Sequence, residues 1–271
     1  MEQILSYISK TLLQHDVSDS GLMYGKMGIA VFFFHYERFT GDKLYRDRAI
    51  ELINNSVQEQ IRQQHIVDYA NGLAGVGTGV EYLAQNDYIK VDTNNFFRKF
   101  DKRIFVATVY GGRTDSSLFT GLSGLGRYLL FRVVGQAAND EHISTLDNKM
   151  LLINITDVFE RMYPSSNDKV NTDIVSFLYA MDQTNIFPAK VKRLLNLFTS
   201  DTSTYGQEDF ILLYQKKIET MYCSTYNQLQ AEIQKNIRQN IIPGLYGGLA
   251  GVGLYILSKL DKKHETWMQL L

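Results

Sequence analysis

Acidic side chains just before short glycine phrases are the residues best placed to do chemistry. Asp68 lies four residues before Gly72, Asp115 lies six before Gly121, and Asp173 precedes a weaker copy of the pattern. Such carboxylates could act as general acid and base, or cleave a glycosidic bond as a pair if they converge. The alternative is structural, because a carboxylate ahead of a helix commonly caps its N-terminus. The predicted catalytic residues are therefore Asp68 and Asp115.

Metal ligands and nucleophiles are sparse in this chain. Cys223 is the only cysteine, which excludes an internal disulfide and a site with several cysteines. No two histidines are four residues apart and none adjoins a cysteine; they are His15, His35, His65, His142 and His264. We expect no metal and no cofactor. Cys223 is expected to be a small buried side chain, and His35 a hydrogen-bonded residue of the core or its rim.

Aromatic and polar side chains beside the glycine phrases could bind a peptide. A tyrosine combines a large apolar ring with a polar tip, and an arginine can clamp a carboxylate. The predicted ligand-binding residues are Tyr24, Tyr69, Asn71, Phe119, Arg127 and Tyr246. The same side chains could instead hold one loop to the next, and Arg127 could serve a structural ion pair.

Four copies of a Gly-x-x-Gly phrase position these residues. They begin at Gly25, Gly72, Gly121 and Gly248, and each leads into an apolar run. The first three are 47 and 49 residues apart, a period typical of helical hairpins, which must stack to bury their apolar faces. We predict one all-α domain over residues 1–271, an α/α toroid with apolar inner helices and amphipathic outer helices. The loops before the inner helices would gather at one mouth.

Local signals predict several helix ends. Residues 2–14 form a first helix, and Gly41 closes a second with a left-handed cap. Asp42 caps a third, whose buried stripe is Tyr45, Ala49, Leu52, Ile53 and Val57. The glycines of each phrase lack a Cβ, which lets a neighbouring backbone approach closely and permits a turn with positive φ.

Composition excludes several classes of protein. The chain has 271 residues, 45% hydrophobic, with 28 basic and 29 acidic side chains and a net charge of −1. A nucleic-acid-binding domain normally carries a basic excess, so none is expected here. There is no signal peptide pattern and no run of about 18 apolar residues. We expect a cytoplasmic protein that does not enter a membrane.

The sequence around two of the phrases resembles lanthionine synthetase C-like (LanC-like) proteins. Ser116 to Leu130 is similar to the third repeat of that family, and Pro243 to Leu257 is similar to its last repeat. The resemblance implies a toroid of nested helices. It also implies zinc-dependent addition of peptide cysteine thiols to dehydroalanine or dehydrobutyrine, which closes thioether rings.

The zinc-binding motifs of that family are missing from this sequence. The family holds its metal with a Trp-Cys-x-Gly phrase and a Cys-His pair, but no repeat glycine here follows Cys-His and Trp267 has no neighbouring cysteine. Pro188 and Pro243 are 55 residues apart, room for little more than one hairpin where about two repeats are implied. We therefore expect a shortened member and pseudoenzyme that binds a precursor peptide or a peptide-modifying enzyme at the mouth. The alternatives are an active enzyme using mouth carboxylates, like glycoside hydrolases built on α/α barrels, and a scaffold whose centre is filled by its own side chains.

Overall fold

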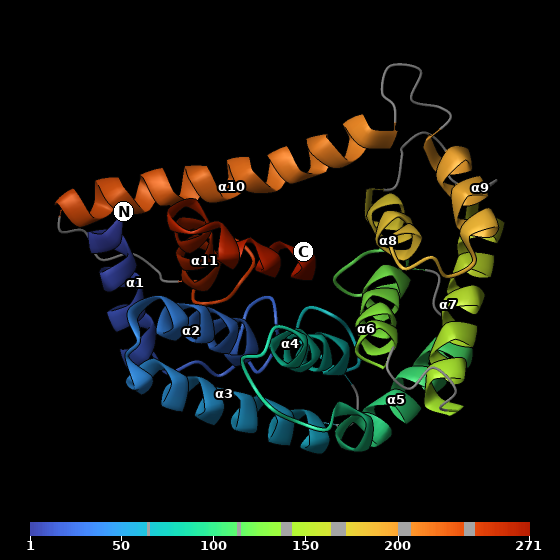
Figure 1. Cartoon of the computed structure of the whole chain (residues 1–271), viewed down its shortest axis with the longest axis horizontal. Coiled ribbons are helices and arrows are strands. Elements are labelled where there is room, and N and C mark those ends of the chain that lie inside the picture. The colour runs from blue at the N-terminus through green and yellow to red at the C-terminus, as the bar shows by residue number, and fades with distance from the viewer. Residues whose placement is uncertain (64–65, 113–114, 137–142, 164–171, 200–206, 236–241) are drawn as a thin grey trace. The chain divides into compact units, whose positions relative to one another are not determined.

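The computed structural model describes residues 1–63, 66–112, 115–136, 143–163, 172–199, 207–235 and 242–271. Within these ranges every regular element is a helix, which confirms the all-α class (Figure 1). None of the described helices is both long and apolar enough to cross a bilayer. The elements are α1 (Glu2–Gln14), α2 (Lys26–Thr40), α3 (Lys43–Arg62), α4 (Leu73–Gln85), α5 (Thr93–Val109), α6 (Leu122–Gly135), α7 (Ile143–Met162), α8 (Thr172–Asp182), α9 (Pro188–Thr199), α10 (Gln207–Lys235), α11 (Leu249–Leu260) and the 3₁₀ helix η3 (Lys262–Leu270).

The chain divides into two compact units. Unit 1 combines Met1–Ile66 with Lys216–Leu271, and unit 2 is Val67–Gln215. The helix α10 begins in unit 2 and ends in unit 1. Whether the units behave as the one domain expected over residues 1–271 stays a prediction.

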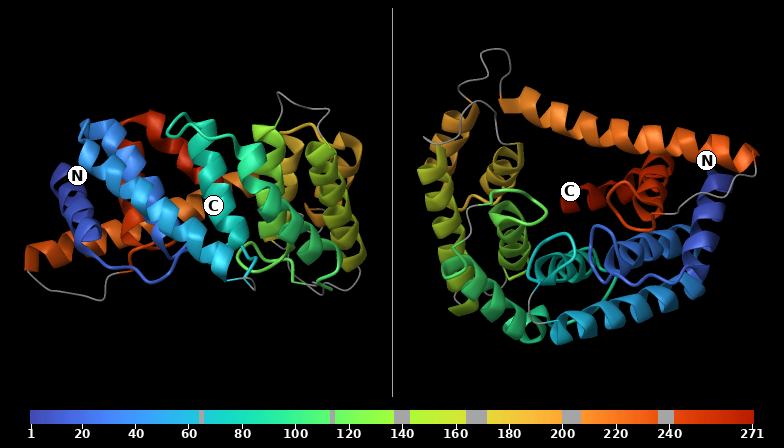
Figure 2. Two further views of the ribbon diagram at one scale, coloured as in Figure 1. Left: turned by 90° about the horizontal axis from the view of Figure 1, so that it is seen from below. Right: turned by 180° about the vertical axis from the view of Figure 1, so that it is seen from behind.

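Helices that follow a glycine phrase are buried on nearly all sides. Every residue from Leu73 to Leu83 of α4 is buried, whereas α3 buries a single stripe. That stripe contains all five residues predicted for it. In unit 1, α2 packs against α1, α3 and α11; in unit 2, α4 packs against α5 and α6, and α6 packs against α7 and α8 (Figures 1 and 2). Buried and one-sided helices therefore alternate from α2 to α6, as the repeats predict.

The predicted helix ends between α2 and α3 are confirmed. Gly41 has φ 76°, and its N–H donates to the carbonyl oxygen of Glu37 at 2.7 Å. Asp42 accepts a hydrogen bond from the N–H of Leu44 at 3.0 Å and so caps α3. Pro188 is the first residue of α9, a position that needs no intrahelical N–H donor.

The interval between α9 and α11 is occupied, in its described part, by the single helix α10 of 29 residues. Tyr222 of this helix is buried, and its hydroxyl donates to the carbonyl oxygen of Leu245 at 2.8 Å. Within α10, Leu229 is buried and Ile233 is half-buried, while Ile237 and Ile241 lie outside the described residues. Residues 188–243 thus hold, in their described part, α9 and α10, where the resemblance implies about two repeats.

Candidate functional site

The loop before each glycine phrase folds back against the helix that follows. The first glycine is the N-cap and has extended φ in all four copies, between −103° and −125°. In each copy an N–H in the first turn donates to a carbonyl oxygen seven residues earlier, which satisfies a donor that a helix start normally leaves open. The pairs are Lys26 with Asp19 (2.9 Å), Ala74 with Val67 (3.4 Å), Leu122 with Asp115 (2.8 Å) and Leu249 with Ile242 (2.8 Å).

Close packing explains the second glycine of the phrase. A Cβ atom at Gly28, Gly124 or Gly251 would overlap the carbonyl oxygen of the leucine six residues earlier in the loop. The second part of the expectation, a turn with positive φ, is wrong for the four N-cap glycines, since their backbones are extended. The phrase is therefore required by the joint between loop and helix.

The first predicted catalytic acid, Asp68, binds backbone groups of its own loop. Its Oδ1 accepts hydrogen bonds from the N–H groups of Asn71 (2.8 Å) and Gly72 (3.0 Å). In unit 1, Asp19 makes a similar turn and accepts from the N–H of Gly21 at 2.6 Å. A recurring aspartate that closes a recurring turn matches the capping alternative.

The second predicted acid, Asp115, is exposed and is used in the same way. Its Oδ1 accepts from the N–H of Ser117 at 2.9 Å, and its Oδ2 accepts from the hydroxyl groups of Ser117 (3.0 Å) and Thr120 (2.5 Å). Asp173, on α8, accepts from the N–H of Leu118 at 2.9 Å. These contacts give each acid a role in loop structure, and a catalytic role for Asp68 and Asp115 remains a prediction.

Four of the predicted ligand-binding residues lie in unit 2, where the loops before α4 and α6 are joined. The N–H groups of Tyr69 and the next residue both donate to the carbonyl oxygen of Phe119 at 3.0 Å. The ring of Tyr69 is fully buried, and burial raises the pKa of its hydroxyl. Asn71, Phe119 and Arg127 are half-buried, and Arg127 donates to the hydroxyl of Ser176 on α8 at 2.7 Å. The last three side chains are the ones that remain accessible.

The other two, Tyr24 and Tyr246, meet in unit 1. Their rings contact edge to face, with centroids 6.4 Å apart, and both are half-buried. The N–H of Tyr246 donates to the carbonyl oxygen of Met23 at 2.9 Å, so the loops before α2 and α11 are joined as those before α4 and α6 are. Burial raises the pKa of Tyr24, and the neighbouring Tyr246 adds to this effect.

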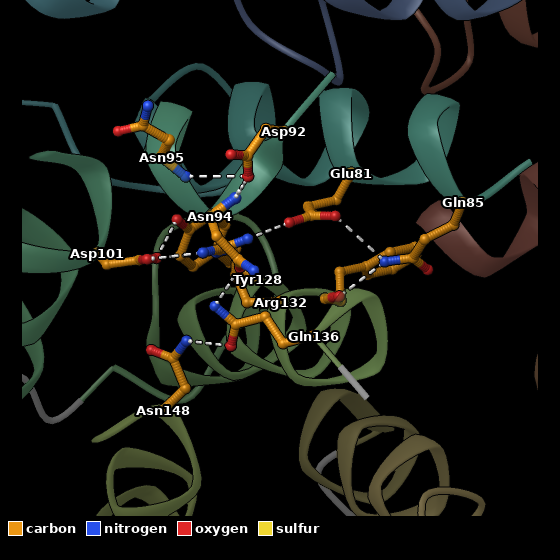
Figure 3. Close-up of polar contacts among 11 residues, drawn as sticks. Glu81, Gln85, Asp92, Asn94, Asn95, Asp101, Tyr128, Arg132, Gln136 and Asn148 are labelled. Atoms are coloured by element: carbon orange, nitrogen blue, oxygen red, sulfur yellow. Dashed lines mark hydrogen bonds and ion pairs between the residues drawn. The ribbon is translucent and has the colours of Figure 1, made fainter. Parts of the chain in front are cut away.

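A buried charge cluster was not anticipated from the sequence (Figure 3). Arg132 of α6 is fully buried; its Nη1 donates to Glu81 of α4, and its Nη2 and Nε donate to Asp101 of α5 at 2.9 and 3.1 Å. The hydroxyl of Tyr128 donates to Asp101 at 2.6 Å. Burial raises the pKa of Glu81, although Arg132 opposes that effect. The sequence signal that could have revealed the cluster is a charged residue, Glu81 or Arg132, within each of two otherwise apolar helical runs.

Amides extend the cluster to a further helix. Gln136, the C-cap of α6, donates to Asn94 of α5 at 2.8 Å, and Asn148 of α7 donates to Gln136 at 3.4 Å (Figure 3). Gln85 of α4 donates to the carbonyl oxygen of Phe131 at 2.7 Å. The network thus ties four helices of unit 2 together.

The described residues do not fit the zinc site that the resemblance implies. That site needs thiolate and imidazole ligands, and the described part of the chain holds no group of three His, Cys, Asp or Glu able to bind a metal. Cys223 lies on α10 and is exposed, so the expectation of a buried thiol is wrong. The expectation for His35 is confirmed, because it is fully buried and hydrogen-bonded to His264, with 2.9 Å between the two Nδ1 atoms.

Comparisons with known proteins agree with the repeat. The family described as Lanthionine synthetase C-like protein matches residues 16–174. Among solved structures, nisin cyclase is similar, with a TM-score of 0.52 and 13% identity over 99% of this chain and 95% of that one. At that identity the likeness shows the fold alone, and it confirms the predicted class, an all-α toroid of helical hairpins. A search of curated proteins found no match.

Proposed function

Since this chain belongs to the lanthionine synthetase C-like family, we propose that it serves a lanthipeptide-type peptide-modification system without performing the zinc-dependent cyclase reaction. The donor set carries this proposal. Thiolate activation by zinc needs several cysteine and histidine ligands around one ion, whereas the single cysteine here, Cys223, is exposed on α10. The cytoplasmic location expected from the sequence belongs to the same proposal.

Its role in that system is to bind a precursor peptide or a partner modifying enzyme through the loops that precede the buried helices. Recognition falls to side chains, because the loops' own carbonyl oxygens already satisfy amides at the helix starts. Asn71, Phe119 and Arg127 in unit 2 and the Tyr24–Tyr246 pair in unit 1 offer partly exposed aromatic, amide and guanidinium groups. Tyr69 is part of the packing beneath them.

Metal analysis combined with a thiol assay tests the loss of cyclase activity. Protein purified without chelators is assayed for zinc and incubated with a dehydrated, cysteine-containing peptide. Ring closure leaves the peptide mass unchanged but removes a free thiol, so thiols are counted by alkylation and mass spectrometry. We expect far less than one zinc per chain and no loss of thiols beyond the protein-free control. Stoichiometric zinc together with thiol loss would end this proposal.

Peptide binding is tested separately. A fluorescein-labelled Ser/Thr/Cys-rich peptide is titrated, before and after dehydration, against the parent protein and against Phe119→Ala and Arg127→Ala. Each truncation removes an accessible anchor, and we expect about tenfold weaker binding. Arg193→Ala, which removes an exposed arginine of α9, is the matched control and should bind like the parent.

A further inference from the structure

The helix α5 presents an unusual face to solvent, separate from the loops discussed above. Its opposite side buries Phe97, Phe100 and Ile104 within unit 2. Arg98, Lys99 and Lys102 lie on the exposed side. Because an α-helix repeats every 3.6 residues, these three cations share one strip of the helix surface.

Apolar side chains continue the same strip at the end of the helix. Phe105, Val106, Val109 and Tyr110 are all exposed, and Tyr110 is 75% exposed. The rings of Phe105 and Tyr110 contact each other edge to face, with centroids 6.4 Å apart. Large apolar groups gathered on a surface are typical of an interaction site. We call this set, from Arg98 to Tyr110, the α5 face.

The charge of the α5 face is not balanced locally. Among the described residues, no ion pair is formed by Arg98, Lys99 or Lys102. The single acid of the helix, Asp101, is bound to the buried Arg132 and faces away. The whole chain carries a net charge of −1, so this strip is a local excess of positive charge that an anionic partner would complement.

We propose that the α5 face docks an acidic amphipathic segment of a partner protein. The face runs about 18 Å from Arg98 to Tyr110, a length that three turns of a partner helix would cover. Acidic side chains of that segment would lie against the three cations, and its apolar side chains against Phe105, Val106, Val109 and Tyr110. The order of the two groups along α5 also fixes the direction of the segment.

A membrane surface fits these observations less well. A helix that lies in a bilayer inserts a continuous apolar stripe and keeps its cations at the rim. The continuous apolar stripe of α5 is the one that contains Phe97, Phe100 and Ile104, and it is already buried. On the exposed side, Lys102 lies in the centre of the strip, where insertion would require its desolvation.

The test uses the full chain and a defined probe. The probe is a fluorescent 16-residue peptide with four glutamates in one half and leucine and phenylalanine in the other, titrated at low and moderate salt. Lys99→Glu/Lys102→Glu turns two attractive contacts into repulsive ones and should weaken binding about tenfold. Val109→Ser/Tyr110→Ser should weaken it similarly and with less salt dependence.

Matched controls carry the same changes elsewhere. Lys192→Glu/Lys217→Glu alters the net charge equally on α9 and α10, and Leu44→Ser/Ile61→Ser removes exposed apolar groups from α3. Both controls should bind the probe within about twofold of the parent. All variants are compared by circular dichroism to confirm folding.

Three results would overturn the proposal. The first is no binding of the probe by the parent below about 100 µM, the weak end for a specific segment. The second is equal binding by the α5-face variants and their controls. The third is binding of phosphatidylserine vesicles, lost in Lys99→Glu/Lys102→Glu, without binding of the peptide, which would identify a lipid surface as the occupant.

Discussion

The guanidinium group of Arg132 is buried and paired with two carboxylates. It is fully buried, as is Glu81, whereas Asp101 keeps some contact with solvent. Transfer of charges into a protein interior is costly, and their mutual attraction offsets that cost only while every partner is present. The cluster is therefore a point of vulnerability at the residue scale.

Removal of Arg132 should be strongly destabilising. Arg132→Met leaves two carboxylates without their cation, and we expect a loss of about 3–5 kcal/mol in the free energy of unfolding, measured in urea by circular dichroism. Arg132→Met/Glu81→Gln removes one stranded charge and should recover part of the loss. Arg193→Met breaks an exposed ion pair with Glu160 and should match the parent. Equal effects of the Arg132 and Arg193 substitutions would show that burial does not matter here.

The pair of histidines in unit 1 predicts an acid-sensitive stability. Burial is the main reason why the pKa of His35 lies well below its usual 6.5, and Arg38 adds to this effect. Burial also lowers the pKa of His264; Arg38 adds to that effect and Asp261 opposes it. Their hydrogen bond between Nδ1 atoms requires one ring nitrogen without a proton. The unfolded chain binds more protons below pH 6.5, so this contribution is present above pH 6.5 and is lost as the pH falls.

Urea titrations between pH 8 and pH 5 test this dependence. We expect the parent to lose stability on acidification and His264→Gln to show a weaker dependence, because one titrating partner is gone. His15→Gln, at the C-terminal cap of α1, should keep the slope of the parent. A slope that His264→Gln leaves unchanged would assign the acid sensitivity to other groups.

At the residue scale the sequence predicted positions better than roles. It placed Asp68 and Asp115 in loops before helices, and the capping alternative matches their contacts. It did not anticipate the Arg132 cluster, because three helices must pack before those side chains meet. It was wrong about Cys223, because that residue lies at an exposed position of α10.

At the scale of an element, the glycine phrase sets how each buried helix begins. Gly124→Ala would place a methyl group against the carbonyl oxygen of Leu118 and the Cβ of Tyr69. Neither neighbour can move without shifting the loop, so we expect a loss of about 1–3 kcal/mol despite the better helix propensity of alanine. Val134→Ala, on the exposed side of the same helix, should stay within about 0.5 kcal/mol of the parent. Thermal or urea unfolding measures both.

Hairpins were predictable because their signals are local. The caps at Gly41 and Asp42 and the stripe of α3 depend only on residues near them in the sequence. The helix α10 is different: its 29 residues carry no glycine phrase, and their position depends on partners such as Leu245 that lie far along the chain. Long-range packing of this kind leaves a weak periodic pattern in the sequence.

At the scale of the whole molecule, unit 1 is built from two separate stretches of chain, and α10 belongs to both units. Trp267, the single tryptophan, is fully buried in unit 1 and contacts Tyr222 edge to face at 5.3 Å. Its fluorescence therefore reports on unit 1, while circular dichroism reports on all helices. Loss of either unit should disrupt α10, so we expect the two signals to give one urea midpoint. Two midpoints would contradict the prediction of a single domain.

The tight joint between loop and helix has a consequence for how such chains are recognised. The carbonyl oxygen of a leucine such as Leu118 or Leu245 occupies the space that a side chain would need at the second glycine. This position must therefore remain glycine in any chain whose helix begins in the same way. A homologue that has lost its catalytic activity therefore keeps the same glycines. A sequence search based on these glycines therefore detects the fold and does not tell whether the protein catalyses a reaction.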